Sequence, residues 1–209
     1  MWNPDQPRDP AGIPTGGQWT AATRVASGPV TVSRGDWRAL PDREFRPCGP
    51  DEFLSARDAF ARSGGEVENL SPAGREELAG RRTFLSADGL TGYTVDRDGD
   101  FGNLFNNRGP VGAGQAGVVD GIRNGARTLD CYDGYLPKVY ARYGYVVTGR
   151  VRFDPRFAPP GWPAAKDSPD VVFMRHAGKG WENAPVRPYR PGEGALFGDW
   201  AEAKARSRE

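Results

Sequence analysis

The 209-residue sequence has one histidine, His176, and two cysteines, Cys48 and Cys131, which lie far apart in the chain. Multi-histidine zinc sites and disulfide frameworks need several such residues at suitable spacing, so neither is expected and no metal site is predicted. A Ser-His or Cys-His triad has only one candidate base. Cys131 stands in an apolar strand context and is expected to be a buried thiol. His176 stands in a glycine-rich stretch and is expected to be exposed to solvent.

The sequence also lacks an excess of either charge, because 28 Lys and Arg face 27 acidic residues and leave a net charge of +1. This balance gives no general attraction to nucleic acid or anionic lipid, so nucleic acid is not an expected partner. No apolar run approaches the ~20 residues that cross a bilayer, and no membrane partner is expected. The first residues have neither the cationic start nor the apolar stretch of a secretion signal, so a cytoplasmic location is predicted.

Glycine and proline are abundant, with 29 and 19 residues, and they gather at the two ends and around one central loop. This distribution predicts an extended Pro/Gly-rich arm over residues 1–45, a compact domain over 46–176 and an irregular tail over 177–209. The arm carries the motif Asn3-Pro4-Asp5-Gln6-Pro7-Arg8-Asp9, followed by Trp19-Thr20. It resembles short segments of bacteriophage head-associated proteins, which implies phage or prophage origin and a virion or host protein partner for the arm.

The compact middle shows a mixed helix and strand pattern. Apolar spacing predicts helices over 49–63, from 71 onward, and over 115–123, 136–143 and 199–206. Alternation and turn residues predict strands over 82–86, 91–96, 100–106, 126–131, 145–153 and 170–175. Asp51 and Ser71 are expected to cap the first two helices. Asp98-Gly99 predicts a hairpin turn, and Gly149 a bend in its strand.

The strongest local motif is Gly112-Ala113-Gly114-Gln115-Ala116-Gly117, which fits the pattern G-x-G-x-x-G. With Asp130 at a later strand end, it could bind a nicotinamide or flavin dinucleotide. The preceding strand is polar and ends too early for that reading, and the Asp-Gly hairpin makes the sheet antiparallel there. The alternative is another pyrophosphate-bearing cofactor. Gly112 and Gly114 would let the backbone approach it, and the amides of Ala113 and Gln115 would face it.

The order of these elements, with Tyr140 four residues before Gly144 and an aromatic residue next, resembles the GNAT superfamily of acyl-CoA-dependent N-acyltransferases. The resemblance covers about residues 50–155. It implies a single α/β domain with a mixed, mostly antiparallel sheet, flanked by irregular arms. It also implies acetyl-CoA or another acyl-CoA as cofactor, and an amine on a small molecule or a protein as acceptor.

The resemblance also assigns the site. It implies that the strand with Leu104, Phe105 and Asn106 binds the pantetheine arm, and that a backbone amide at or near Phe105 holds the acyl carbonyl. The pyrophosphate would lie on the loop and helix start formed by Arg108, Gly112, Ala113, Gly114 and Gln115. Tyr140 would be the general acid for the leaving thiolate. The chain departs from the superfamily at Gly109, where Gln or Arg is usual, and at 130–134, where an asparagine-bearing segment is usual.

Other readings stay open at this point. The general base could be any of four carboxylates, Glu66, Glu68, Asp96 or Asp133. An NAD-using ADP-ribosyltransferase could begin at Arg82 and Ser86, but the late strands carry no Glu-x-Glu pair. A non-catalytic virion-associated or antidefence protein on the same scaffold is the third reading, because a fold does not fix an activity.

Overall fold

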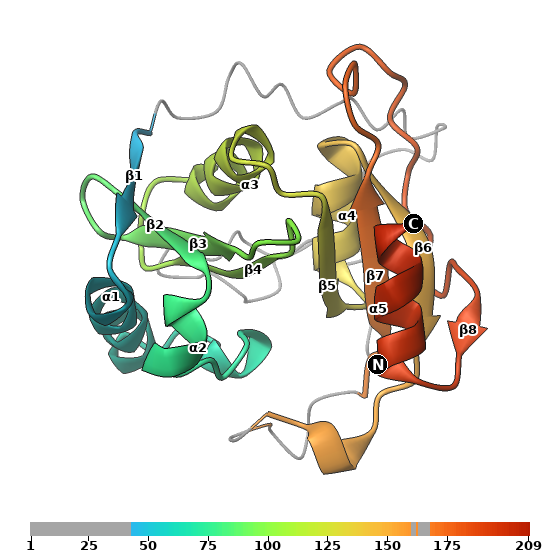
Figure 1. Ribbon diagram of the computed structural model, residues 1–209, viewed down its shortest axis with the longest axis horizontal. Coiled ribbons are helices and arrows are strands. Elements are labelled where there is room, and N and C mark those ends of the chain that lie inside the picture. Colours follow the sequence, from blue (N-terminus) through green and yellow to red (C-terminus); the bar gives the residue numbers. More distant parts are fainter. Residues whose placement is uncertain (1–42, 160–161, 163–167) are drawn as a thin grey trace, which may run out of the picture.

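The computed structural model describes residues 43–159, 162 and 168–209. The arm predicted over 1–45, with its phage-type motif, lies almost entirely outside these residues. Within them the chain forms two four-stranded sheets side by side, with helices on both faces (Figure 1). The mixed, mostly antiparallel α/β class predicted from the sequence is confirmed.

The first sheet is an antiparallel meander. It has the order β1 (Phe45–Cys48), β2 (Arg82–Ser86), β3 (Thr91–Val95) and β4 (Phe101–Asn106). The hairpin predicted at Asp98-Gly99 is confirmed, and Gly99 adopts the φ of +85° that such a turn demands. The strand β1 was not predicted. It is short, contains a proline and lies at the edge of the sheet.

The second sheet contains the later strands. It has the order β5 (Thr128–Tyr132), β7 (Val171–His176), β6 (Tyr145–Val151) and β8 (Leu196–Phe197), and only the β6–β8 pair is parallel. The bend expected at Gly149 appears as a register shift between Val147 and Gly149. The ring of Phe197 lies so close to Gly149 that a Cβ there would be 2.3 Å from it, so only glycine fits.

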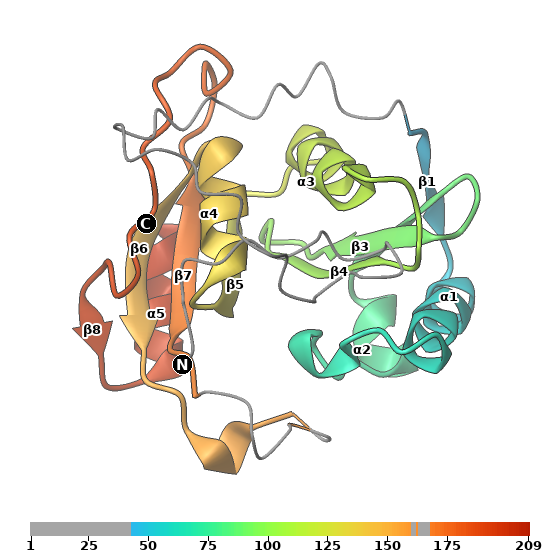
Figure 2. The same cartoon turned by 180° about the vertical axis from the view of Figure 1, so that it is seen from behind.

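The two sheets meet at β4 and β5, and they barely join. A single parallel bridge, between Asp100 and Thr128, connects these two edge strands. Beyond it the strands belong to separate sheets, and Figures 1 and 2 show the sheets turned away from each other. The backbone groups on the facing edges of β4 and β5 are therefore not consumed by a shared ladder.

Helices cover both faces. They are α1 (Pro50–Arg62), α2 (Arg75–Ala79), α3 (Ala113–Arg123), α4 (Tyr135–Arg142) and α5 (Trp200–Arg208), with short 3₁₀ turns at Val67–Asn69 and Pro155–Phe157. Side chains of α3 and α4 share one apolar core over both sheets. A second core lies under α1 and α2, and a third lies under α5. Figures 1 and 2 show α5 on the face of the second sheet opposite α4.

Two predicted caps are wrong. The N-cap of α1 is Gly49, and Asp51 sits inside the first turn, where its carboxylate binds Arg75 at 2.7 Å. The second helix starts at Arg75 after Gly74, and not at Ser71. In both cases a glycine in extended conformation starts the helix, and the expected side-chain cap does not form.

The stretch after residue 177 was expected to be irregular apart from a helix over 199–206. It contributes the strand β8, which was not predicted, and α5, which agrees with the predicted helix. Trp181 and Tyr189 are buried in the main core, and Ala203 of α5 is fully buried against Phe173. The prediction that His176 is exposed is wrong, because it ends β7 and contacts the rings of Tyr145 and Trp181. None of the described helices combines the length and apolar character needed to cross a membrane.

Candidate functional site

The loop that follows β4 is held in shape by asparagines. The side-chain oxygen of Asn106 accepts the amide of Gly109 at 3.1 Å and the hydroxyl of Thr91 at 3.0 Å. The amide of Asn107 donates to the carbonyl of Leu90 at 2.6 Å. The predicted site residue Asn106 therefore fixes the start of the loop with its side chain.

The loop turns sharply into α3. Arg108 has a φ of +56° and Gly112 a φ of +88°, in the left-handed region that only glycine enters without strain. The helix begins at Ala113, earlier than the predicted start at Gln115. The guanidinium of Arg108 donates to the carbonyl of Ser63 at 3.2 Å, which ties the loop to the end of α1.

The amino end of α3 leaves two of its amides free. The amide of Ala113 donates to the carbonyl of Pro110 at 3.0 Å, and that of Ala116 to Gly112 at 2.9 Å. Within the described part of the chain, the amides of Gly114 and Gln115 donate to no acceptor. A Cβ built at Gly114 would meet no atom within 4 Å, so the space above this turn is open. Free amides, a helix dipole and open space fit a phosphate group.

Other glycines of α3 have a packing role. A Cβ at Gly117 would lie 3.1 Å from the Leu104 side chain, and one at Gly121 would lie 2.5 Å from the ring of Phe101. These glycines let α3 lie close against β4. Leu104 packs in that core, whereas Phe105 points its ring to the opposite face, against the rings of Phe53 and Phe60.

The strand β4 is irregular at its middle. Its register against β3 shifts between Gly92 and Thr94, and Asn103 there has a φ of +50°. Asn103 is only 4% exposed, and among the described residues neither atom of its carboxamide has a hydrogen-bond partner. A buried carboxamide without partners in the protein is costly, so Asn103 is a candidate ligand contact next to the parting strands.

Tyr140, the predicted general acid, lies on α4 in the main core. Its ring packs edge-on against Phe101 at 6.4 Å and Tyr145 at 5.9 Å. Burial, and then the proximity of Cys131, raise its pKa well above the ordinary value for tyrosine. Burial likewise raises the pKa of the Cys131 thiol, but Cys131 is only partly buried, and not fully buried as predicted.

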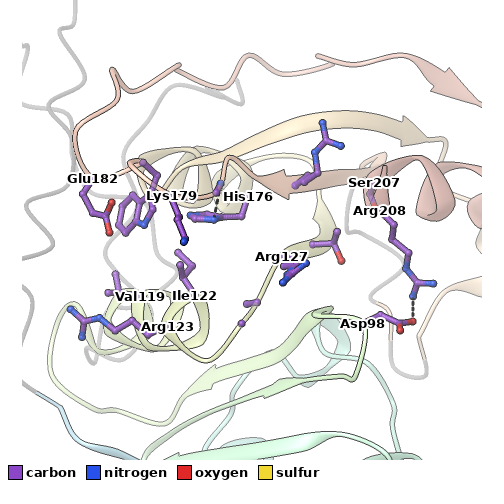
Figure 3. Close-up of a pocket in the computed structure, with 16 residues that line it drawn as sticks. Asp98, Val119, Ile122, Arg123, Arg127, His176, Lys179, Glu182, Ser207 and Arg208 are labelled. Atoms are coloured by element: carbon purple, nitrogen blue, oxygen red, sulfur yellow. Dashed lines mark hydrogen bonds and ion pairs between the residues drawn. The ribbon is translucent and has the colours of Figure 1, made fainter.

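A cavity of about 660 Å³ lies elsewhere, at the carboxyl end of α3 (Figure 3). It is lined by the last turn of α3, the segment leading into β5, the end of β7 and the end of α5. None of the residues predicted for the site lines it. It is therefore separate from the glycine loop, which lies at the amino end of the same helix.

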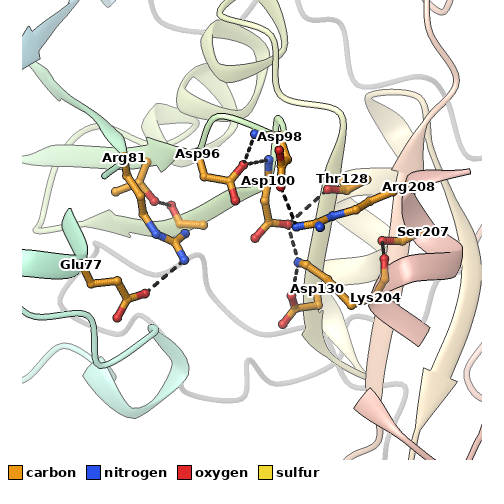
Figure 4. Close-up of polar contacts among 12 residues, drawn as sticks. Glu77, Arg81, Asp96, Asp98, Asp100, Thr128, Asp130, Lys204, Ser207 and Arg208 are labelled. Carbon is orange, nitrogen blue, oxygen red and sulfur yellow. Dashed lines mark hydrogen bonds and ion pairs between the residues drawn. The ribbon is translucent and has the colours of Figure 1, made fainter. Parts of the chain in front are cut away.

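At the base of the parting strands lies an ion cluster that the sequence did not predict (Figure 4). The ammonium of Lys204, on α5, binds Asp100 and lies 2.8 Å from the carboxylate of Asp130, and Thr128 donates to Asp100 at 3.2 Å. Burial raises the pKa of Asp100 and outweighs the attraction of Lys204. Burial alone would lower the pKa of Lys204, but Asp130 and Asp100 together raise it.

Two of the candidate bases hold local structure. The carboxylate of Asp96 accepts the amides of Asp98 at 2.8 Å and Asp100 at 2.7 Å, so it shapes the hairpin turn. That of Asp133 accepts the amide of Gly192 at 3.0 Å. Glu66 accepts the side chain of Asn69 at 2.5 Å, and Glu68 lies in the same short turn. No single base is singled out by these contacts.

The residues proposed for an ADP-ribosyltransferase site also have a local role. The hydroxyl of Ser86 donates to Asp88 at 2.6 Å and accepts the amide of Thr91 at 3.0 Å. It therefore closes the turn between β2 and β3. Arg82 is exposed at the other end of β2.

No family model matches, and no curated protein matches. Among solved structures, the chain is similar to a GCN5-related N-acetyltransferase from Rhodopseudomonas palustris, with 16% identity over 66% of this chain and 96% of that chain and a TM-score of 0.44. It is similar to a GCN5-related N-acetyltransferase from Kribbella flavida, with 17% identity, coverage of 70% and 98%, and a TM-score of 0.41.

A third similar structure is described as an acyl-CoA N-acyltransferase from Klebsiella pneumoniae, with 16% identity, coverage of 64% and 96%, and a TM-score of 0.36. These proteins are of the kind that the sequence resembles.

Proposed function

We propose that the protein is an acyl-CoA-dependent N-acyltransferase, which transfers an acetyl or similar acyl group to an amine. The proposal rests on the position of β4 relative to the amino end of α3. The strand β4 runs along the junction where the two sheets part, and leads directly into a turn whose free amides stand at the amino end of α3. An extended ligand with a pyrophosphate at one end could lie along the edge of β4 and place its pyrophosphate on the free amides at the start of α3.

The residues present fit such a carrier. The amides of Gly114 and Gln115 would hold the pyrophosphate, with Arg108 nearby in the loop and Gly112 allowing the turn. The edge of β4 from Asn103 to Asn106 would bind the pantetheine amides. When bound, acyl-CoA would supply an acyl thioester, which an amine can attack with release of a thiol.

The chain's own contribution would be positioning and proton transfer. A backbone amide of β4 at or near Phe105 would hold the acyl carbonyl, and the irregular register at Asn103 frees groups for this. Tyr140 carries its proton at neutral pH, since the ordinary pKa of tyrosine is near 10 and burial raises the pKa of Tyr140 further. It would therefore act as a proton donor to the departing sulfur, and not as a phenolate base.

Acetyl-CoA should raise the melting temperature of the protein if the glycine turn is its binding site, because a ligand at 100 times its Kd stabilises by about 2.7 kcal/mol. The Gly114→Leu variant tests the location. Its side chain enters open space, so folding should persist, but it blocks the approach of a phosphate. Loss of the acetyl-CoA effect in this variant, with an unchanged melting temperature in buffer, is the expected result.

NAD and CoA without an acyl group complete the design. Stabilisation by NAD, and not by acetyl-CoA, would overturn the proposal in favour of a dinucleotide enzyme. Stabilisation by neither would leave the scaffold as a binding module. The acceptor class, a small-molecule or a protein amine, is part of the proposal, and a radiolabelled acetyl group with candidate amines identifies it. Partnership with a virion or host protein stays a prediction from residues 3–20.

A further inference from the structure

The cavity at the carboxyl end of α3 has an unusual charge for this protein. Five cationic side chains line it, which are Arg123, Arg127, Arg175, Lys179 and Arg208. Two carboxylates, Asp98 and Glu182, also line the cavity. Asp98 forms an ion pair with Arg208 at 3.2 Å, so one carboxylate and one cation neutralise each other. The chain as a whole has a net charge of only +1, whereas cationic side chains outnumber carboxylates in the lining of this cavity.

Two of the cations are placed to meet a ligand. Arg127 precedes β5 and Lys179 follows β7, and both are exposed. Figure 3 shows Lys179 directed toward Ile122, and Arg127 on another side of the same cavity, beside the segment that leads into β5. Among the residues that the structure describes, neither forms an ion pair. A guanidinium fork and an ammonium group that line one cavity suit an anion with several acceptor oxygens.

Part of the remaining wall is apolar. Val119 and Ile122 contribute from α3, and Trp181 contributes from the loop after β7. Trp181 is held by an edge-on contact with His176, at 5.7 Å between ring centroids. A volume of about 660 Å³ is within the range of small-molecule sites. The cavity therefore offers an apolar surface and a cationic edge to the same ligand.

The carboxyl end of α3 would oppose an anion if its carbonyls were free, because that end carries partial negative charge. Three of these carbonyls, of Asp120, Gly121 and Ile122, are satisfied here. The amides of Asn124, Gly125 and Ala126 donate to carbonyls of the last turn of α3, at 2.9, 3.0 and 2.9 Å. The positive side chains around the opening then dominate the local field.

We propose that this cavity binds a small organic phosphate, with the phosphate on Arg127 and Lys179 and its apolar portion on Val119, Ile122 and Trp181. The site is distinct from the proposed acyl-carrier site. The two lie at opposite ends of α3, which has 11 residues and is about 16 Å long at 1.5 Å per residue. The inference does not depend on the proposed function.

The chain's single histidine makes the test specific. His176 lines the cavity, so the NMR signals of its imidazole report from this site without assignment of other residues. The probe is phenyl phosphate, titrated at constant pH and constant ionic strength. A saturable shift of the His176 signals is expected. Phenol, which lacks the phosphate, and sodium chloride should produce no saturable shift of the His176 signals.

Variants separate the site from general electrostatics. Arg127→Gln with Lys179→Gln should weaken phenyl phosphate binding at least about tenfold, as the loss of two charge-assisted contacts implies. Arg62→Gln with Lys138→Gln removes the same charge from exposed positions outside the cavity and should change binding less than about twofold. Gly114→Leu should leave the shift unchanged.

Three results would overturn the proposal. The first is the absence of a saturable shift in the wild-type protein. The second is equal weakening in both double variants, which would mean that only net charge matters. The third is loss of the shift in Gly114→Leu, which would place the probe at the glycine turn.

Discussion

The ammonium of Lys204 lies 2.8 Å from the carboxylate of Asp130 and joins the last helix of the chain to the edge strand β5. The same ammonium binds Asp100, at the one bridge between β4 and β5. Lys204 is only 6% exposed. An ion cluster and a helix from the other end of the domain therefore hold the base of the junction, where the sheets have almost no backbone pairing.

Replacement of Lys204 should destabilise the protein strongly. Lys204→Met keeps the length of the side chain but leaves the buried Asp100 and the half-buried Asp130 without their cation. Removal of one partner of a buried pair costs about 3–5 kcal/mol, which urea unfolding would measure. Arg206→Met is the matched control on the same helix. Its ion pair with Glu209 is exposed, so a change below about 1 kcal/mol is expected. Similar effects of both variants would contradict this role of the cluster.

The contribution of Lys204 should also depend on pH. Because its pKa is raised in the folded state, its stabilising effect is fully present below its ordinary pKa of 10.5 and is lost as pH rises through the folded value. The buried tyrosines Tyr93, Tyr140 and Tyr145 titrate in the same direction, since burial raises their pKa values. The difference in unfolding free energy between wild type and Lys204→Met isolates the lysine. That difference should be constant near neutral pH and shrink above about pH 10.5. A difference that grows with pH would reverse the assigned sign.

Gly121 should resist substitution although it lies inside a helix. Alanine there gains helix propensity of about 1 kcal/mol, but its Cβ would lie 2.5 Å from the ring of Phe101. Overpacking typically costs 1–3 kcal/mol, so Gly121→Ala should lower the stability to urea. Gly114→Ala, on the same helix and in open space, is the control and should raise it slightly. Equal gains from both substitutions would show that α3 can move away from β4.

The sequence predicted much of the fold because local chemistry decides it. The hairpin at Asp98-Gly99 fixes the register of β3 and β4, and the predicted strand over 82–86 is found with the same bounds. The turn that leads into α3 could also be predicted from the sequence, because the positive φ of Gly112 favours glycine. These features depend on residues close in sequence, and their side-chain requirements are nearly unique.

What the sequence did not predict depends on distant partners. The strand β1 is four residues long and exists because it pairs with β2, which comes after two helices. Lys204 reads as a solvated charge in a polar helix, and only the packing of α5 on the second sheet brings it to Asp100 and Asp130. His176 was expected to be exposed for the same reason, since Trp181 covers it from a loop without strand or helix periodicity.

Tyr140→Phe should separate catalysis from packing. Phenylalanine keeps the ring contacts with Phe101 and Tyr145, so the melting temperature and the affinity for acetyl-CoA should stay nearly unchanged. Loss of a general acid lowers turnover by roughly 10²-fold or more, which an assay of thiol release would measure. Tyr143→Phe, at the end of the same helix, is the control and should keep its turnover. Full activity in Tyr140→Phe would leave the residue a core aromatic only.

Replacement of Asn103 should raise the stability of the protein and lower its affinity for acetyl-CoA. It holds a φ of +50° and buries a carboxamide that finds no partner among the described residues, and each such unsatisfied group costs about 1–3 kcal/mol. Asn103→Gly removes both penalties and loses the packing of a small side chain, so a net gain of about 1 kcal/mol in unfolding free energy is expected. If the carboxamide meets the acyl carrier, the same variant should lose affinity for acetyl-CoA in the thermal shift.

Asn103→Ala completes this comparison. It also lacks the carboxamide, but its Cβ keeps the strain of a positive φ, so it should be less stable than Asn103→Gly by about 1 kcal/mol. Both variants should lose acetyl-CoA affinity equally, because the missing group is the same. A Gly variant that is less stable than wild type would mean that the carboxamide is satisfied in solution. Its burial beside the parting strands would then serve the fold, and the acyl carrier would be held by the backbone of β4 alone.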